Sequence, residues 1–200
     1  MDDIRLRTSP LDDGRRFRAW MWVATSLTAV LLVSVAVPLA ATLYGVHLLA
    51  AFATSLALAG ALPLAVRWPW PAAALATASI LVFALLSAES DASPWPWPVT
   101  TIIGQSLLLI VVGLMRTWWV GLATWLAGVV VTMPFAFVDM GAAANVVTGA
   151  AVTALAFAVA LLIAQRRQIG AELFRERAHS ASEQQRRVLV EERNRVAREL

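Results

Sequence analysis

Six apolar runs, each close to the length of a membrane crossing, constrain this chain more than any other feature of its sequence. They cover residues 20–37, 45–66, 72–86, 99–115, 118–138 and 146–164. A transmembrane helix needs roughly 20 mostly apolar residues to cross a hydrocarbon layer about 30 Å thick. Because 60% of the 200 residues are hydrophobic, little of the chain remains for an extramembrane enzyme. The sequence therefore predicts an all-α integral membrane bundle of six transmembrane helices.

The charged segments that flank the apolar runs divide the chain into three parts. Residues 1–19 hold five arginines and four aspartates, and Pro10 and Gly14 interrupt any periodicity, so we expect a short flexible N-terminal arm. Residues 20–164 form the transmembrane domain, and residues 165–200, with nine Arg and six Glu, form a charged tail. A signal peptide is the competing interpretation of the first run. The mixed-charge leader, and the second run that follows at once, favour a retained helix.

Proline and polar residues mark the expected ends of several spans. We expect a turn over residues 38–44 between the first two spans, and a kink at Pro134 in the last turn of the fifth. Residues 139–145 are expected to close the fifth span before the sixth begins at Val146. Between the third and fourth apolar runs, residues 87–98 form the one sizeable polar loop that separates two spans.

The arginines lie on one side of the predicted membrane. With the N terminus inside, the inner segments are the N-terminal arm, Arg67, Arg116 and the tail, and together they hold all 16 basic residues. The outer connections hold no arginine and carry the acidic residues Glu89, Asp91 and Asp139. By the positive-inside rule, this separation predicts a multi-pass protein with both termini in the cytoplasm.

Tryptophan marks the ends of the predicted spans. Eight of the nine tryptophans lie there: Trp20, Trp22, Trp68, Trp70, Trp95, Trp97, Trp118 and Trp119. An amphipathic indole ring suits the headgroup layer, so we interpret these residues as interfacial anchors. The motif Trp-Pro-Trp-Pro occurs twice, at 68–71 and 95–98, and a repeat or a ligand-binding motif is the alternative interpretation.

Ionisable residues are missing from the interior of the predicted spans, which weakens an interpretation as a pump, transporter or channel. The polar candidates that remain, all near the predicted outer side, are His47, Gln105, Asp139 and Asn145. These four could form a sensing pocket; the alternative is that each faces headgroups or bonds a neighbouring helix. The chain has no cysteine, and one imidazole makes no metal site, so we expect no metal and no catalytic residue in it.

The tail has the composition of a helix. It is rich in Ala, Leu, Glu, Gln and Arg and contains no proline, so we expect the sixth span to continue as a long cytoplasmic helix. Pairs such as Glu183 with Arg187 favour this helix. Its apolar stripe, which includes Leu189, Val196 and Leu200, is thin for a lone helix and suggests a dimeric coiled coil. On periodicity alone, a solvated charged tail is an equal alternative.

The last ten residues of the tail read E-E-R-N-R-V-A-R-E-L and end at Leu200. This stretch resembles E-R-x-R-I-A-R-E-L, which opens the dimerisation and phosphoacceptor helix of bacterial sensor histidine kinases of the NarL/DesK type. The residues that fit the motif are Glu192, Arg193, Arg195, Ala197, Arg198, Glu199 and Leu200, with Val196 in place of the usual isoleucine. The resemblance is strong over this stretch and loose over the rest of the tail.

The resemblance implies a homodimeric sensor in the bacterial inner (plasma) membrane that relays a stimulus to a phosphoacceptor helix by helix rotation or shift. In the family, His and Asp follow this motif directly, and an ATP-binding domain lies beyond them. This chain stops at Leu200, and His179 has no such motif around it, so we expect no kinase activity from these 200 residues. The resemblance implies ATP and Mg for the missing kinase domain alone, and a response regulator as partner of the full-length protein.

Two other functions are compatible with the same residues. The first is a small integral membrane protein that binds a lipid or an apolar small molecule and has a helical cytoplasmic tail. The second is a membrane-bound DNA-binding protein, which we disfavour because six Glu are interspersed with the nine Arg of the tail. We therefore expect the lipid bilayer as a partner, and no direct contact with nucleic acid.

Reporter fusions test the predicted topology. Because all arginines fall on one side, a reporter fused after Ala92 should lie outside, and one fused after Leu200 should lie in the cytoplasm. Paired fusions to alkaline phosphatase, which is active outside, and β-galactosidase, which is active inside, give the measurement. A cytoplasmic location for residue 92, or the same side for both fusions, would contradict the six-span topology.

Overall fold

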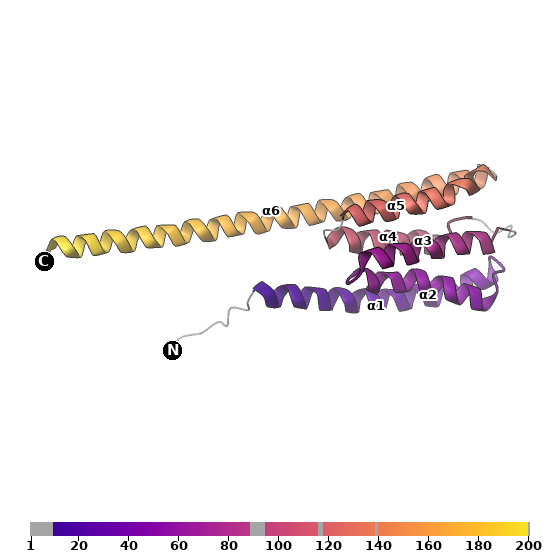
Figure 1. The fold of residues 1–200 in the computed structure, drawn as a ribbon, viewed down its shortest axis with the longest axis horizontal. Helices are drawn as coiled ribbons and strands as arrows, with labels where there is room; N and C mark the ends of the chain where they lie inside the picture. Colours follow the sequence, from indigo (N-terminus) through magenta and orange to yellow (C-terminus); the bar gives the residue numbers. More distant parts are fainter. Residues whose placement is uncertain (1–9, 89–94, 116–117, 139, 200) are drawn as a thin grey trace. The chain divides into compact units, whose positions relative to one another are not determined.

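The computed structural model describes residues 10–88, 95–115, 118–138 and 140–199, and every secondary-structure element in these ranges is a helix. The elements are α1 (Pro10–Thr42), α2 (Leu48–Ala65), α3 (Pro69–Leu86), α4 (Val99–Leu114), α5 (Trp118–Thr132), the 3₁₀ helix η1 (Met133–Phe137) and α6 (Met140–Glu199), as Figure 1 shows. The prediction of an all-α protein is therefore confirmed for the described residues.

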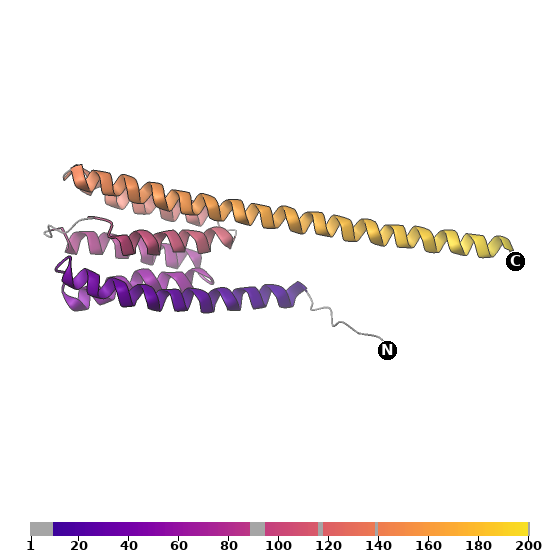
Figure 2. The ribbon, with the colours of Figure 1, turned by 180° about the vertical axis from the view of Figure 1, so that it is seen from behind.

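Contacts divide the chain into two units, Met1–Leu161 and Leu162–Leu200. In the first unit, α2 packs against α1, α3 and α4, and α5 packs against α3 and α4. Helices α1 to α5 lie alongside one another in both ribbon views (Figure 1 and Figure 2). The largest buried cluster consists mainly of alanine, leucine and valine, among them Ala59, Ala61, Leu62, Ala72, Ala76, Leu108 and Val112. Small side chains let helices approach closely, which is how membrane helices gain packing energy in a lipid solvent.

Five helical segments in the described ranges are long and apolar enough to cross a membrane: Arg16–Thr42, Leu48–Ala65, Pro69–Leu86, Trp118–Phe137 and Met140–Leu173. These segments indicate an integral membrane protein. The apolar helix α4 has 16 residues, and at 1.5 Å per residue it spans about 24 Å, less than the roughly 30 Å of a hydrocarbon layer. The number of crossings therefore stays a prediction.

The first helix is longer at both ends than the sequence predicts. It begins at Pro10, so residues 10–19 are helical instead of a flexible arm, and it continues through Pro38 to Thr42. Proline suits the first turn of a helix, and inside a membrane helix neighbouring groups satisfy the freed backbone. At the end of the helix, the Thr42 hydroxyl donates to the Pro38 carbonyl at 2.7 Å. The prediction of a turn is therefore wrong for residues 38–42, which belong to α1.

A glycine ends α1. Gly45 has a φ of +64°, the left-handed conformation that a residue without Cβ adopts at no steric cost. The Val46 N–H donates to the Ala40 carbonyl at 3.2 Å, a bond across six residues that satisfies a carbonyl in the last turn. The bond is one residue longer than the 6→1 bond of a Schellman cap, and Gly45 supplies the left-handed residue between its two ends. The chain therefore reverses direction at Gly45 and not at Pro38.

The connection between the last two α-helices lies earlier in the chain than predicted. α5 ends at Thr132, and Pro134 lies in the first turn of η1, so the proline follows the end of the α-helix where a kink was expected. α6 begins at Met140, before the expected Val146. Asn145 therefore belongs to α6, while Asp139 lies outside the described residues.

The close approach of α6 to α4 and α5 depends on glycine. A Cβ added at Gly121 of α5 would overlap the ring of Phe157 on α6, and one added at Gly113 of α4 would lie 3.0 Å from the Ala160 Cβ. The Trp125 Nε1–H of α5 donates to the Ala150 carbonyl at 3.0 Å. The membrane part of α6 therefore packs directly against two neighbouring helices.

The second unit, taken by itself, is helical. α6 extends to Glu199, which confirms the helix predicted for the tail. Ile169 and Leu173 are exposed in the single chain, and Gln168 Nε2 donates to Glu172 Oε1 at 3.1 Å. The side chains from residue 181 onward, which include the predicted dimer seam and the family motif, lie outside the described residues.

Replacing Gly121 tests the contact between α5 and α6. Gly121→Ala should lower the unfolding temperature, because the added methyl overlaps the Phe157 ring, and overpacking of this kind costs about 1–3 kcal/mol. Gly60→Ala is the matched control: nothing lies within 4 Å of a Cβ at this position of α2, so the gain in helix propensity should stabilise by up to about 1 kcal/mol. Thermal unfolding in detergent measures both variants. Equal unfolding temperatures would contradict the packing described.

Candidate functional site

The two Trp-Pro-Trp-Pro motifs adopt different structures. In the first copy, Pro69 begins α3, and Trp68 and Trp70 are 54% and 60% exposed, as interfacial anchors should be. The second copy precedes α4, and its Trp97 is 0% exposed. The anchor interpretation is therefore wrong for Trp97, which fills the interior of the bundle. The half-buried Trp95 lies beside it and donates its Nε1–H to the Ala84 carbonyl at 3.3 Å.

Asn145 of α6 binds the backbone of Trp97 with both ends of its side-chain amide. The Trp97 N–H donates to Asn145 Oδ1 at 2.8 Å, and Asn145 Nδ2 donates to the Trp97 carbonyl at 3.1 Å. Trp97 is not part of a helix, so its backbone groups have no intrahelical partners. A buried backbone group without a partner costs about as much as a lost hydrogen bond. We call this pair of bonds the Trp97–Asn145 clasp.

Two glycines make room for the Trp97 ring. A Cβ added at Gly149 of α6 would lie 2.5 Å from Trp97 Cε3, and one added at Gly128 of α5 would lie 3.8 Å from Trp97 Cζ2. Gly149 is one helical turn beyond Asn145 on α6. The same face of α6 therefore both holds the backbone of Trp97 and receives its ring.

Gln105 of α4 lies near Gly128, beside which the Trp97 ring also lies. It is fully buried, and its Nε2 donates to the Thr124 carbonyl on α5 at 3.5 Å. A Cβ at Gly128 would lie 3.5 Å from the same nitrogen, so Gln105 and Trp97 both border Gly128. Gln105 Oε1 and Trp97 Nε1 are enclosed and have no hydrogen-bond partner among the described residues. Each such atom carries a desolvation cost of about 1–3 kcal/mol.

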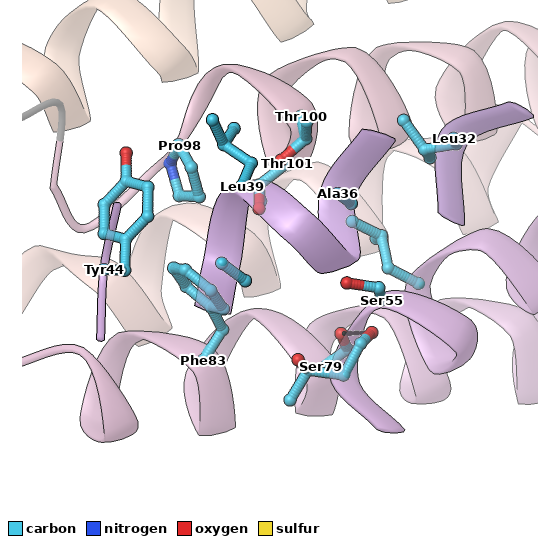
Figure 3. Close-up of a pocket in the computed structure, with 13 residues that line it drawn as sticks. Leu32, Ala36, Leu39, Tyr44, Ser55, Ser79, Phe83, Pro98, Thr100 and Thr101 are labelled. Atoms are coloured by element: carbon cyan, nitrogen blue, oxygen red, sulfur yellow. Dashed lines mark hydrogen bonds between the residues drawn. The ribbon is translucent and has the colours of Figure 1, made fainter. Parts of the chain in front are cut away.

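A small pocket rich in hydroxyl groups lies between α1, α2, α3 and the start of α4 (Figure 3). Its volume is about 20 Å³, and its lining residues are Leu32, Ala36, Leu39, Ala40, Tyr44, Thr54, Ser55, Leu58, Ser79, Phe83, Pro98, Thr100 and Thr101. Figure 3 places Tyr44, Phe83 and Pro98 at one end and Leu32 at the other. The Tyr44 and Phe83 rings meet edge to face at 5.4 Å, and burial raises the pKa of the Tyr44 phenol above its ordinary value.

A larger groove runs between α3 and α5. Its volume is about 450 Å³, within the range of roughly 300–1,000 Å³ that is usual for small-molecule sites. It is lined mainly by alanine and other small or apolar residues: Trp70, Ala73, Ala74, Thr77, Ala78, Leu81, Ala123, Thr124, Ala127 and Val131. A groove of this composition suits an apolar molecule.

Of the four residues predicted as a sensing pocket, the structure describes His47, Gln105 and Asn145, and each makes a different contact. Gln105 and Asn145 both approach Trp97, as described above. His47 is exposed and caps α2, where its Nδ1 accepts from the Leu49 N–H at 3.4 Å. Asp139 lies outside the described residues. The interpretation that each residue bonds a neighbouring element therefore describes Asn145 and His47 better than a shared pocket does.

Sequence reasoning missed the central role of Trp97. One signal was available, because Arg67 alone separates the motif at 68–71 from an apolar run, whereas the motif at 95–98 follows a polar stretch. Among the described residues, no group of three or more His, Cys, Asp and Glu side chains is placed to bind a metal. The chemistry that these residues can perform is packing and hydrogen bonding.

Comparison with known proteins gives no assignment: no protein-family model, no curated protein and no solved structure matches this chain. The functional argument therefore depends on the residues and contacts described above.

Removing the amide of Asn145 tests the clasp. Asn145→Leu keeps a side chain of similar size but leaves the Trp97 N–H and carbonyl unpaired in the interior. At about 1–3 kcal/mol for each unpaired group, the loss of stability should exceed about 2 kcal/mol. Thermal unfolding in detergent, followed by tryptophan fluorescence, gives the measurement. Thr148→Val, at an exposed position on the same helix, is the control and should change little; an equally small effect of Asn145→Leu would contradict the clasp.

Proposed function

We propose that this protein is the membrane sensor and signal-transmitting region of a NarL/DesK-type histidine kinase of a two-component system. One observation supports this most directly. The family-like motif at residues 192–200 begins within α6, and the same helix contains the apolar segment Met140–Leu173. A rotation or shift of the membrane part of a continuous helix is passed along that helix. The motif is thus at the place where a membrane signal would act on a phosphoacceptor helix.

The proposed topology has six crossings in a bacterial inner membrane. α4 alone is short, but the segment 95–98, buried from Pro96 onward, extends it, and residues 95–115 together reach the roughly 20 residues of a crossing. An even number of crossings places both termini on the same side, as the distribution of arginine requires.

In this proposal the signal enters α6 through the Trp97–Asn145 clasp. The segment 95–98 belongs to the connection between α3 and α4, on the predicted outer side. A stimulus that displaces this segment would change both the hydrogen bonds of Asn145 and the packing at Gly149. Two packings that differ by a few kcal/mol are sufficient for a switch of this kind.

The partners follow from the family resemblance. The tail pairs with that of a second copy through Leu189, Val196 and Leu200, and the lipid bilayer surrounds the membrane part. ATP and Mg are used by the kinase domain that the family carries after this motif, and a response regulator receives the phosphate. No residue of this chain is assigned a catalytic role.

A second candidate function is favoured by the groove between α3 and α5. Its volume of about 450 Å³ and its alanine-rich walls would accommodate a lipid chain or an apolar small molecule. Such a protein would need no kinase domain, and its tail would be a solvated helix. The two functions differ in one testable respect: a rotation of the tail helix about its axis would change the output of a kinase sensor but not the binding of an apolar ligand.

Insertions after Gly170 test the kinase proposal. The chain is joined directly after Leu200 to the phosphoacceptor and ATP-binding part of a NarL/DesK-type kinase, beginning at its histidine. One inserted residue rotates the following helix by about 100°, while seven nearly restore the phase. The one-residue insertion should change autophosphorylation roughly fivefold or more, a typical coupling between sites, and the seven-residue insertion should largely preserve it.

Phosphate incorporated from ATP, measured in membrane vesicles, gives the result. A chimera with glutamine in place of the phosphoacceptor histidine is the control and should incorporate none. If the intact chimera is inactive, or if both insertions leave its rate unchanged, the kinase proposal fails and the apolar-ligand function becomes the better account.

A further inference from the structure

Three hydroxyl groups in the small pocket have no hydrogen-bond partner within the part of the chain that the structure describes. They belong to Ser55 of α2 and to Thr100 and Thr101 of α4, which are 8%, 9% and 6% exposed. Figure 3 shows all three among the residues that line the pocket. Their oxygens are not among the fully enclosed unpaired atoms but line the pocket, where a hydroxyl in a protein surrounded by hydrocarbon gains from a hydrogen-bond partner.

The other hydroxyl groups of α2 and α3 that line the pocket are already bonded. Thr54 Oγ1 donates to the Ala50 carbonyl at 2.9 Å, and Ser79 Oγ donates to the Thr54 carbonyl at 2.7 Å. Among the α2, α3 and α4 residues that line the pocket, the unused hydroxyls are therefore those of Ser55, Thr100 and Thr101; Gln105 Oε1 and Ser106 Oγ of α4 also have no partner among the described residues but do not line it. Each of these hydroxyls can donate one hydrogen bond and accept others.

The size of the pocket determines what can use this capacity. A cavity needs about 10–15 Å³ of space for the centre of a water-sized sphere to hold one water molecule. A buried water typically makes about three hydrogen bonds. The pocket has about 20 Å³, which is enough for one water and too little for a larger ligand. We propose that one water molecule occupies this pocket and is bound by the hydroxyls of Ser55, Thr100 and Thr101.

Such a water would join α2 to α4 where the two helices pack together. Thr100 and Thr101 lie in the first turn of α4, directly after the buried segment that ends at Pro98. The water therefore supports the start of α4, beside Trp97. This inference is independent of the kinase proposal, because an internal water serves the fold whatever the tail does.

Replacing Thr101 by valine separates a wet pocket from a dry one. Thr101→Val keeps the shape of the side chain and removes its hydroxyl. If a water is bound, the variant loses a bond to it, and the unfolding temperature of the full chain in detergent should fall by about 2–4 °C. If the pocket is dry, the substitution removes an unpaired polar group and the unfolding temperature should rise. A rise would overturn the proposal.

A double substitution tests whether the hydroxyls share the same water. Ser55→Ala should also lower the unfolding temperature, and combined with Thr101→Val the total fall should be smaller than the sum, because the water is already lost. Thr132→Val is the matched control: this fully buried threonine of α5 donates to Gly128 O at 2.8 Å, and its effect should add to that of Ser55→Ala. Strict additivity of Ser55→Ala and Thr101→Val would overturn the shared water.

A direct measurement covers the case in which a variant fails to fold. In solid-state NMR of the unmodified protein in lipid vesicles, magnetisation should pass from water to the methyl group of Thr101 and not to that of Thr132. No transfer to Thr101 would overturn the proposal.

Discussion

Hydrocarbon offers no hydrogen-bond partner, so the polar groups of the apolar helices have to be satisfied within the chain itself. Buried threonines do this locally: Thr124, Thr132 and Thr153 each donate to a carbonyl four residues earlier. The segment before α4 cannot do so, because Trp97 is buried but not helical. Asn145 supplies from α6 the donor and the acceptor that the Trp97 backbone lacks. The burial of this segment, and with it the position of the start of α4, depends on that one amide.

The packing of the helices depends on glycines placed next to large aromatic rings. A tryptophan ring inside a bundle of close-packed helices requires space, and Gly149 and Gly128 provide it on α6 and α5. Gly121 does the same for Phe157, with the aromatic ring on α6 and the glycine on α5. The membrane part of α6 thus makes two close aromatic contacts: Gly149 packs against the Trp97 ring, and the Phe157 ring packs against Gly121 of α5. A change in the position of either ring would therefore alter the packing of α6, the helix that continues into the tail.

The sequence predicted the class of fold and the approximate position of every helix, because apolar runs of this length are a strong and local signal. It predicted helix ends less well. Pro38 suggested a turn, whereas the chain reverses at Gly45, whose φ of +64° is the decisive feature. Asn145 was recognised as a candidate, but its partner Trp97 is 48 residues away in the sequence. Such a pairing depends on tertiary structure, and a tryptophan at the end of an apolar run resembles an interfacial anchor until its burial is known.

The two hydrogen bonds of the Trp97–Asn145 clasp are satisfied, but two side-chain atoms close to it have no hydrogen-bond partner among the described residues. Trp97 Nε1 and Gln105 Oε1 are enclosed without partners among the described residues, although one is a donor and the other an acceptor. At about 1–3 kcal/mol for each group, this cost is comparable to the few kcal/mol that separate the two packings of a conformational switch. An arrangement in which these atoms found partners would recover part of that energy. In the proposed function, where a signal would pass through Trp97 to α6, this unsatisfied pair would reduce the energy difference between the packing described and a second packing of the segment at 95–98.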